Sequence, residues 1–279
     1  MNKVSYLGIA GSNSYVAAIR YFGEQTVLIG TPRFLDIFNS VINKNVDFGI
    51  IPIENSLAGS IVENYDLLLK LPVTVVGEYY LKFENHLLGI TSNIQEFDIR
   101  QIKKVYSHPQ PLAQCFNFFN SHKWIEKISY SDTAAASKFV SENNDPSCAS
   151  IGNREASKLY NLEILRENIA DNVEGNFTRF FVVAINPIYT EIPNKATFQF
   201  TLQHVPGSLS KLLTIFANYS LNLNKIESRP IHGTPFEYIF IVDIELNEEF
   251  QNNKSSILNE IKENTTSLQI LGYYKGGII

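Results

Sequence analysis

Residues 49–62 read Gly-Ile-Ile-Pro-Ile-Glu-Asn-Ser-Leu-Ala-Gly-Ser-Ile-Val, and the stretch changes character within a few positions. An apolar run typical of a buried strand gives way directly to Glu54, Asn55 and Ser56 and then to a glycine. In an α/β sheet, side chains just past the end of a central strand point into the crevice where ligands bind. The stretch therefore predicts a central strand that presents polar groups to a ligand.

A simpler interpretation of the same stretch is a turn followed by a helix cap. Asparagine and serine are favoured in both. Gly59-Ser60 would then start a helix whose apolar face is Ile61, Tyr65, Leu68 and Leu69. The stretch alone does not separate the two interpretations.

Up to about residue 186, short apolar strands alternate with amphipathic helices, which is the pattern of parallel α/β layers. Residues 4–8 and 103–106 are expected strands, and Thr31-Pro32 is an expected helix start. A helix after residue 109 is expected to bury Leu112, Phe116 and Phe119. Residues 73–83 and 87–91 are expected to form longer strands that carry the chain between two lobes.

Residues 187–195 are polar and interrupted by Pro187 and Pro193, as in a domain linker. The remaining residues, 196–279, show the order strand, helix, strand, strand, helix, strand. This order, βαββαβ, predicts a ferredoxin-like domain. Its expected core positions are Phe198, Phe200, Leu202, Leu209, Leu212, Leu213, Phe216, Phe250, Ile257, Leu258 and Ile261.

Composition excludes several classes of protein. The chain has 279 residues, 44% of them hydrophobic and 18% charged, and a net charge of −5. This length favours about two domains, and the charge does not fit a nucleic-acid binder. The apolar stretches are far shorter than the roughly 20 residues that span a bilayer, and the N-terminus lacks the long apolar region of a signal peptide. We expect a cytoplasmic protein with no membrane partner.

The chain offers no clear metal-binding pattern. Cys115 and Cys148 both fall within regular elements, so reduced buried thiols are expected rather than a disulfide. The histidines show no metal-ligand spacing, and no cysteine joins them at ligand distance in sequence. They are His86, His108, His122, His204 and His232. A metal site is therefore not expected.

Polar junctions recur where a strand ends or a helix begins. They lie at residues 8–14, 54–59, 107–114, 131–133 and 176–180. Helix N-termini present unpaired N–H groups and can hold anionic oxygens without lysines. Capping explains each junction singly. Their recurrence at equivalent positions favours a carboxylate-binding cleft.

The chain closely resembles prephenate dehydratase with a C-terminal ACT regulatory domain, over nearly its whole length. The segments that carry the resemblance are Pro52–Gly59 (PIENSLAG), Ser107-His108-Pro109-Gln110 with Gln114, Asp132-Thr133-Ala134-Ala135, Asn176-Phe177-Thr178-Arg179-Phe180, Pro206-Gly207-Ser208-Leu209 and Glu227-Ser228-Arg229-Pro230. The family's early Gly-Pro-x-Gly-[Ser/Thr]-aromatic-Ser pattern appears at residues 8–14 without its proline and its aromatic residue.

The resemblance implies an α/β catalytic domain at residues 1–186 with two lobes, similar to periplasmic binding proteins, a linker at 187–195 and an ACT domain at 196–279. It also implies that prephenate loses CO₂ and water to give phenylpyruvate, the step toward phenylalanine. This reaction needs no redox cofactor, and no cofactor is expected. The chain begins at the first dehydratase strand, so we expect a monofunctional enzyme.

The resemblance implies roles for individual residues. Thr178 matches the family's essential threonine and is assigned to the leaving hydroxyl, with Glu54 as a candidate proton source that could equally hold a helix terminus. Arg179 either pairs with a carboxylate or is structural. The other predicted catalytic residues are Asn55 and Ser56, and the predicted substrate-binding residues are Ser12, Ser107, Gln114, Thr133 and Phe180.

L-Phenylalanine is the effector that the ACT resemblance implies. Its predicted site combines Pro206, Gly207, Ser208 and Leu209 with Glu227, Ser228, Arg229 and Pro230, where two regulatory domains meet. A site shared between subunits implies a homodimer or a homotetramer. Two rival functions stay open: an arogenate dehydratase, and a non-catalytic sensor of amino acids or keto acids.

Overall fold

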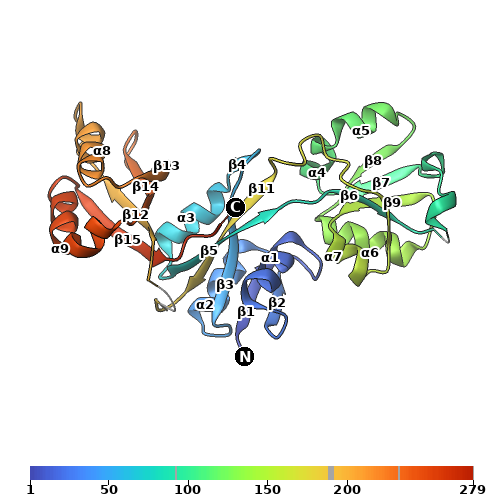
Figure 1. Ribbon diagram of the computed structural model, residues 1–279, viewed down its shortest axis with the longest axis horizontal. Coiled ribbons are helices and arrows are strands. Elements are labelled where there is room, and N and C mark those ends of the chain that lie inside the picture. The colour runs from blue at the N-terminus through green and yellow to red at the C-terminus, as the bar shows by residue number, and fades with distance from the viewer. Residues whose placement is uncertain (92, 188–191, 232, 279) are drawn as a thin grey trace. The chain divides into compact units, whose positions relative to one another are not determined.

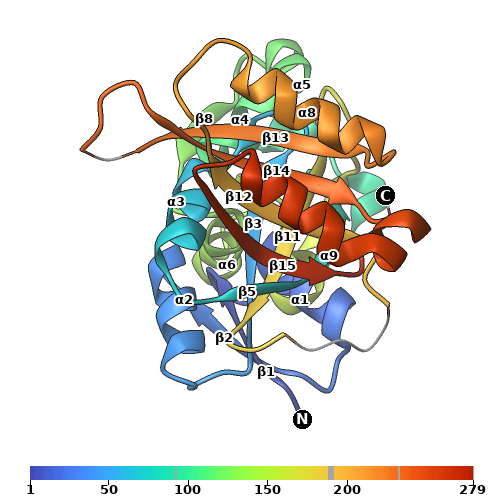
Figure 2. The ribbon, with the colours of Figure 1, turned by 90° about the vertical axis from the view of Figure 1, so that its left-hand side faces the viewer.

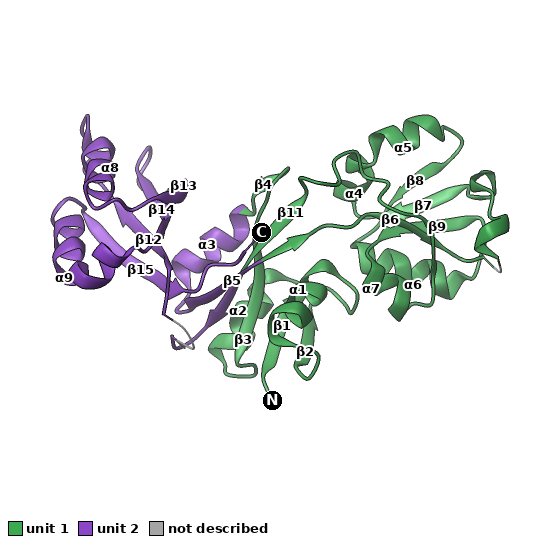
Figure 3. Ribbon diagram, in the orientation of Figure 1, with its two compact units in different colours: residues 1–61, 80–180, 279 green, residues 62–79, 181–278 purple. Residues whose placement is uncertain are grey.

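The structure is a computed structural model that describes residues 1–91, 93–187, 192–231 and 233–278 (Figure 1). The chain divides into two compact units (Figure 3). The first contains residues 1–61 and 80–180, and the second contains residues 62–79 and 181–278.

The first sheet has the strand order β2-β1-β3-β11-β5, with β4 paired to β3. Its strands are β1 (Lys3–Leu7), β2 (Val27–Thr31), β3 (Phe48–Asn55), β4 (Gly59–Ser60), β5 (Thr74–Lys82) and β11 (Phe177–Ala184), accompanied by the helices α1 (Asn13–Phe22) and α2 (Phe34–Ile42). Strand β1 runs parallel to both β2 and β3. Strand β3 lies inside the sheet, and its residues Ile50, Ile51 and Ile53 have no exposed surface. The predicted central strand is confirmed.

The predicted helix start at Gly59-Ser60 is wrong. These two residues form β4, which turns back antiparallel onto β3, with Glu54 opposite Ser60 and Asn55 opposite Gly59. Helix α3 (Val62–Lys70) begins only after this hairpin. The Asn55 side chain closes the turn, because its Oδ1 accepts hydrogen bonds from the backbone N–H groups of Leu57 (3.1 Å) and Ala58 (3.0 Å). The stretch is thus both a central strand and a tight turn.

The second sheet forms another lobe within the first unit, with the order β10-β6-β9-β7-β8. Its strands are β6 (His86–Gly89), β7 (Lys104–Ser107), β8 (Glu126–Ser129), β9 (Cys148–Gly152) and β10 (Glu163–Arg166). The accompanying helices are α4 (Pro109–Gln114), α5 (Phe116–Ser121), α6 (Thr133–Asn143) and α7 (Arg154–Leu159), with 3-10 turns η1 (Ile94–Glu96) and η2 (Ile99–Gln101). Strand β7 runs parallel to β8 and β9, whereas β6 runs antiparallel to β9 and β10. This sheet is mixed rather than parallel throughout.

The single helix expected after residue 109 is two helices. The backbone leaves the helical region at Cys115 (φ −108°, ψ 36°), between α4 and α5. Leu112 and Phe119 are buried as predicted, but Phe116 is 64% exposed. The break changes the helical phase, so a residue four positions after Leu112 no longer lies on the same face.

The C-terminal module has the predicted order βαββαβ (Figure 2). It consists of β12 (Lys195–Thr201), α8 (Ser208–Asn218), β13 (Leu223–Pro230), β14 (Tyr238–Glu245), α9 (Glu248–Glu263) and β15 (Ser267–Tyr274). The sheet order is β13-β14-β12-β15, and β12 and β14 each run antiparallel to both of their neighbours. One core joins Phe198 and Phe200 of β12 to Phe216 of α8 and Ile261 of α9. The predicted fold class, a two-lobed α/β region followed by a ferredoxin-like module, is confirmed.

Two ion pairs within the second unit join the C-terminal module to α3 and β5. Lys195 Nζ lies 2.9 Å from Glu78 Oε2, and both side chains are buried. Arg229 Nε and Nη2 lie 3.0 and 3.3 Å from the two carboxylate oxygens of Asp66. Because a buried charge left unpaired costs about 3–5 kcal/mol, loss of either partner of the Lys195 pair would destabilise the protein strongly.

The predicted linker includes residues 188–191, which lie outside the described residues. Before them, β11 ends at Ala184, and after them β12 begins at Lys195. The domain boundaries at residues 186 and 196 stay a prediction.

Candidate functional site

The polar ends of β3 and β11 meet because the two strands are neighbours in the first sheet. The side-chain Nδ2 of Asn55 lies 3.0 Å from Thr178 Oγ1, 2.9 Å from Asn176 Oδ1 and 3.1 Å from the carbonyl oxygen of Phe177. Asn55 is 4% exposed and Thr178 is 3% exposed. The predicted catalytic residues Asn55 and Thr178 are therefore in direct contact.

The turn after β3 determines which way the Asn55 amide faces. Its oxygen accepts from the backbone N–H groups of Leu57 and Ala58, which can only donate. The Nδ2 group is consequently directed at β11 and donates there. Thr178 accepts this hydrogen bond through Oγ1, so its own hydroxyl proton is not used in the contact.

Ser56 ties the same turn to the segment that precedes Thr178. Its hydroxyl donates to the carbonyl of Gly175 (2.5 Å) and accepts from the N–H of Phe177 (2.9 Å). Its backbone N–H also donates to the carbonyl of Phe177 at 2.9 Å. In this structure, Ser56 holds the backbone that carries Thr178.

Gln114 extends the network from the second lobe. Its Oε1 accepts from Asn176 Nδ2 at 3.0 Å and from Asn85 Nδ2 at 3.4 Å. Gln114 is the last residue of α4, whereas Asn176 immediately precedes β11. The predicted residues Gln114, Asn55 and Thr178 thus belong to one chain of hydrogen bonds that passes through Asn176.

A cavity of about 530 Å³ lies in the first unit. Its lining comes from three of the five polar junctions: Gly8, Ile9, Ser12, Asn13 and Ser14 from the first, His108, Gln110 and Pro111 from the third, and Ser131, Asp132 and Thr133 from the fourth. Among the described residues, the rest of the lining consists of Leu7, Gly30, Thr31, Pro32 and Phe83. The described lining contains no lysine or arginine.

Helix N-termini open at this cavity. Ser12 Oγ accepts from the N–H of Tyr15 at the start of α1, and Asp132 Oδ1 accepts from the N–H of Ala135 at the start of α6. Helix N-termini carry partial positive charge and favour anions, although the Asp132 carboxylate offsets part of this at α6. The arrangement suits a ligand with carboxylate groups.

The other predicted residues occupy different surroundings. Ser12 and Thr133 line the cavity. Ser107 has no exposed surface and donates to the carbonyl of Ile151 at 3.2 Å, and Phe180 is 1% exposed. Arg179 is 5% exposed, and Glu54 is half-buried on β3. Neither Ser107, Phe180 nor Thr178 lines the cavity, so their contact with substrate stays a prediction.

Two residues that the sequence did not indicate hold the loop after β1. Tyr160 donates its hydroxyl to the carbonyl of Ala10 (2.5 Å), and Asn153 Nδ2 donates to the carbonyl of Gly11 (3.0 Å). Gly11 has a φ of +86°, and a Cβ there would lie 3.3 Å from the Cα of Ala156. The glycine is needed both for its backbone conformation and for this close approach. About 140 residues separate the partners, and no local pattern signals such a contact.

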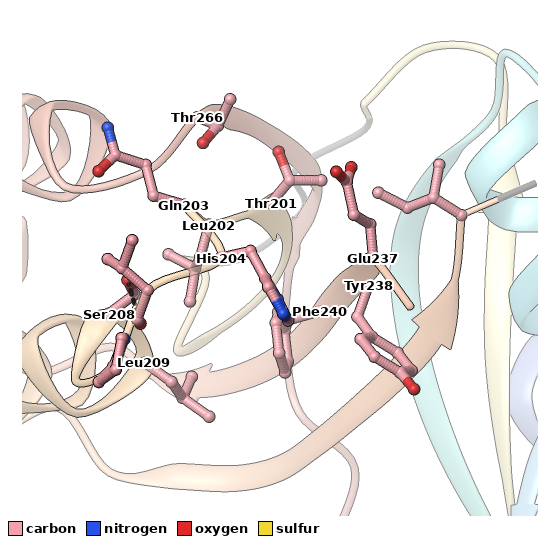
Figure 4. Close-up of a pocket in the computed structure, with 13 residues that line it drawn as sticks. Thr201, Leu202, Gln203, His204, Ser208, Leu209, Glu237, Tyr238, Phe240 and Thr266 are labelled. Carbon is pink, nitrogen blue, oxygen red and sulfur yellow. Dashed lines mark hydrogen bonds between the residues drawn. The ribbon is translucent and has the colours of Figure 1, made fainter. Parts of the chain in front are cut away.

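A second cavity, of about 510 Å³, lies in the C-terminal module (Figure 4). Three residues of the predicted effector site line this cavity, namely Pro206, Ser208 and Leu209. Glu237, Tyr238 and Phe240 line it as well. Gly207, with a φ of +87°, is the N-cap of α8 and lines an adjacent cavity of about 420 Å³.

The other half of the predicted effector site lies on β13, outside this lining. Arg229 is paired with Asp66, and Glu227 lies 3.6 Å from Lys225 Nζ. Ser228 is opposite Phe240 and Pro230 is opposite Tyr238 across the β13–β14 ladder. Residues 227–230 line neither of these two cavities.

Clusters of metal-binding side chains and reactive cysteines are both lacking among the described residues. No group of three His, Cys, Asp or Glu side chains there could hold a metal ion, and His232 lies outside the described residues. Cys115 and Cys148 are free and buried. Burial raises the pKa of Cys115 to about 12 and also raises the pKa of Cys148. Both thiols are therefore protonated at neutral pH. No described helix is long and apolar enough to cross a membrane.

Comparison with known proteins agrees with this architecture. A sequence model of the prephenate dehydratase family matches residues 4–187, and a model of the ACT domain matches residues 196–252. The chain is 37% identical over 281 residues to the bifunctional chorismate mutase/prephenate dehydratase of Escherichia coli, covering 98% of this chain and 70% of that protein. It is 36% identical over 288 residues to the chloroplastic arogenate dehydratase/prephenate dehydratase 1 of Arabidopsis thaliana, covering 98% and 71%.

A solved structure shares the fold. The prephenate dehydratase of Arthrobacter aurescens in complex with L-Phe aligns with a TM-score of 0.85 at 23% identity, covering 98% of this chain and 90% of that one. The fold and the two family matches together identify a lyase with a two-lobed α/β region and an ACT domain. The chain belongs to the prephenate dehydratase family. Its activity is that of a prephenate or arogenate dehydratase.

Proposed function

We propose that this protein converts prephenate to phenylpyruvate, with Thr178 acting on the departing hydroxyl. The contact between Asn55 Nδ2 and Thr178 Oγ1, at 3.0 Å, carries the proposal. Because the hydroxyl of Thr178 accepts from Asn55, its own O–H is directed elsewhere and can form a hydrogen bond to the oxygen that leaves the ring.

The proposed reaction balances without a redox partner. The bond between the ring and one carboxylate breaks, CO₂ leaves, and the electron pair enters the ring. The ring C–O bond breaks, and the departing hydroxide takes up a proton to leave as water. Since the ring becomes aromatic, orientation and help for the poor leaving group are what the protein adds.

An alcohol is too weak an acid to supply this proton alone, so Thr178 orients and hydrogen-bonds the leaving oxygen while a proton arrives from a second group. Glu54, which is half-buried near the end of β3, is the proposed source. The substrate carboxylates are proposed to bind in the cavity lined by Ser12 and Thr133, at the N-termini of α1 and α6.

We also propose that L-phenylalanine inhibits the enzyme through the ACT domain, as the complex of the Arthrobacter aurescens protein with L-Phe suggests. Pro206, Ser208 and Leu209 would form one wall of the site. Residues 227–230 of a second subunit would form the other, which requires a homodimer or homotetramer. The Arg229–Asp66 ion pair is the proposed link from this strand to α3, which follows the Asn55 hairpin in sequence.

The proposal is tested by phenylpyruvate formation from prephenate, measured by absorbance in alkali, with and without L-phenylalanine. Turnover that phenylalanine suppresses is the expected result. Faster turnover of arogenate than of prephenate would assign the chain to the arogenate dehydratases. If neither compound reacts, the proposed activity is wrong.

A further inference from the structure

Asn176 occupies the middle of the hydrogen-bond chain that leads to Thr178. Its side-chain oxygen accepts from Asn55 Nδ2 at 2.9 Å, and its side-chain nitrogen donates to Gln114 Oε1 at 3.0 Å. Asn176 is 1% exposed, and its side chain does not line the cavity. Because protein side chains engage both ends of its amide, we expect Asn176 to affect the reaction through these neighbours.

The orientation of each amide in this series of hydrogen bonds is determined from the Asn55 end. The N–H groups of Leu57 and Ala58 can only donate, so the Asn55 oxygen faces the turn and its nitrogen faces β11. The acceptor that meets this nitrogen must be the oxygen of Asn176. The nitrogen of Asn176 then faces Gln114, which must present its oxygen. Each amide has one allowed orientation as long as its neighbours are present.

We infer that Asn176 is a positioning residue: it holds the Asn55 amide so that one N–H is donated to Thr178 Oγ1 and the Thr178 proton stays available. This inference rests on the proposed role of Thr178. The Nδ2 group of Asn55 has two hydrogens for three acceptors, namely Asn176, Phe177 and Thr178. Removing the Asn176 oxygen takes away one of the contacts that fix the plane of the Asn55 amide, so its hydrogen bond to Thr178 becomes less well aligned.

The test is a double-mutant cycle between Asn55→Ala and Asn176→Ala, with kcat and KM measured on prephenate. Since small misplacements at a reacting centre cost on the order of 100-fold in rate, Asn176→Ala should lower kcat by about 10- to 100-fold with KM near the wild-type value. If Asn176 acts only through Asn55, adding Asn176→Ala to the Asn55→Ala enzyme should lower kcat no further. Equal losses in both backgrounds, or an unchanged kcat in Asn176→Ala, would overturn the inference.

A second variant addresses folding. Asn176→Asp keeps an acceptor for Asn55, and Gln114 can turn its amide to donate to the new carboxylate. We expect this variant to retain kcat within about tenfold of the wild type, since a donor to a charged acceptor can replace the lost contact. If Asn176→Asp loses as much kcat as Thr178→Ala does, the positioning role is contradicted. This comparison can be made even if Asn176→Ala does not fold.

Asn247→Ala is the matched control. Asn247 caps α9 in the C-terminal module, where it bonds to Phe250, Tyr219 and Ser220. Its loss should lower the thermal midpoint without changing kcat in the absence of phenylalanine. Thr178→Ala separates the role of Thr178 from the role of Asn176. If Thr178→Ala stays active on prephenate, the proposed role of Thr178 fails, and the present inference fails with it. If Thr178→Ala is inactive but the Asn55 and Asn176 effects are additive, only the present inference fails.

Discussion

Asn55 Nδ2 and Thr178 Oγ1 lie 3.0 Å apart although 123 residues separate them in the chain. The contact exists because β3 and β11 are neighbours in the first sheet and both carry polar residues at their ends. A hydroxyl that accepts from a fixed amide keeps its own proton for another oxygen.

Thr178→Ala should lower kcat by on the order of 100- to 1000-fold, the usual cost of losing a donor to developing negative charge. The thermal midpoint should change little, because Asn55 Nδ2 keeps its acceptors at Asn176 and Phe177. Thr178→Ser, which retains the hydroxyl, should keep part of the rate. Steady-state kinetics on prephenate measures both variants. Wild-type activity in Thr178→Ala would exclude Thr178 from the reaction.

Thr133→Val should raise KM for prephenate by about tenfold or more, with a smaller change in kcat. Thr133 lines the cavity at the start of α6, and a hydrogen bond from its hydroxyl to a charged group would contribute about 1.5–3 kcal/mol. Thr26→Val is the matched control, since Thr26 is a half-buried threonine outside that cavity and bonds to the Phe22 carbonyl. Equal KM values in the two variants would argue against substrate binding at Thr133.

Asp66→Ala should raise the phenylalanine concentration needed for half-inhibition by at least about threefold, because coupling energies between sites typically reach 1–3 kcal/mol. The substitution breaks the bond between the Asp66 carboxylate and Arg229 on β13. Activity without phenylalanine should stay near the wild-type value. The control is Asp36→Ala, which breaks the exposed ion pair with Arg33. The measurement compares the phenylalanine inhibition curves of the two variants. Identical curves would show that the Asp66–Arg229 contact carries no coupling.

The stability of the protein should fall as the pH drops below about 6.5, the ordinary pKa of histidine. Burial lowers the pKa of His86, and the positive charge of Arg154 lowers it further. Glu84 and Glu167 raise this pKa, but burial outweighs them. His86 Nδ1 accepts from the N–H of Asn168 at 3.1 Å, which suits the neutral ring. The unfolded chain therefore takes up the proton first, and protonation favours unfolding.

Thermal midpoints between pH 7.5 and 5.0 test this effect in the wild type and in His86→Gln. The variant should lose less stability over this range, because it has no proton to take up on unfolding at this position. Parallel curves for the two proteins would assign the acid sensitivity to other groups.

Much of the fold could be predicted from periodicity. The alternation of Phe198 and Phe200 and the helical spacing of Leu212 and Phe216 identified strand and helix correctly, because each element must bury one face. The failures were local. The helix after residue 109 broke at Cys115, and Gly59-Ser60 formed a strand, since in both places a short-range turn replaced the periodic pattern.

The alternation of strands and helices, the βαββαβ module, the family resemblance and the residue types of the site could all be identified from the sequence. The folded structure was needed to show that Asn55, Asn176 and Gln114 form one series of hydrogen bonds, that Ser12 and Thr133 share a cavity, and that Ser107 and Phe180 are buried. The difference follows from the sequence separation over which each interaction acts. Hydrophobic periodicity repeats every few residues, whereas a hydrogen bond between side chains depends on which strands become neighbours.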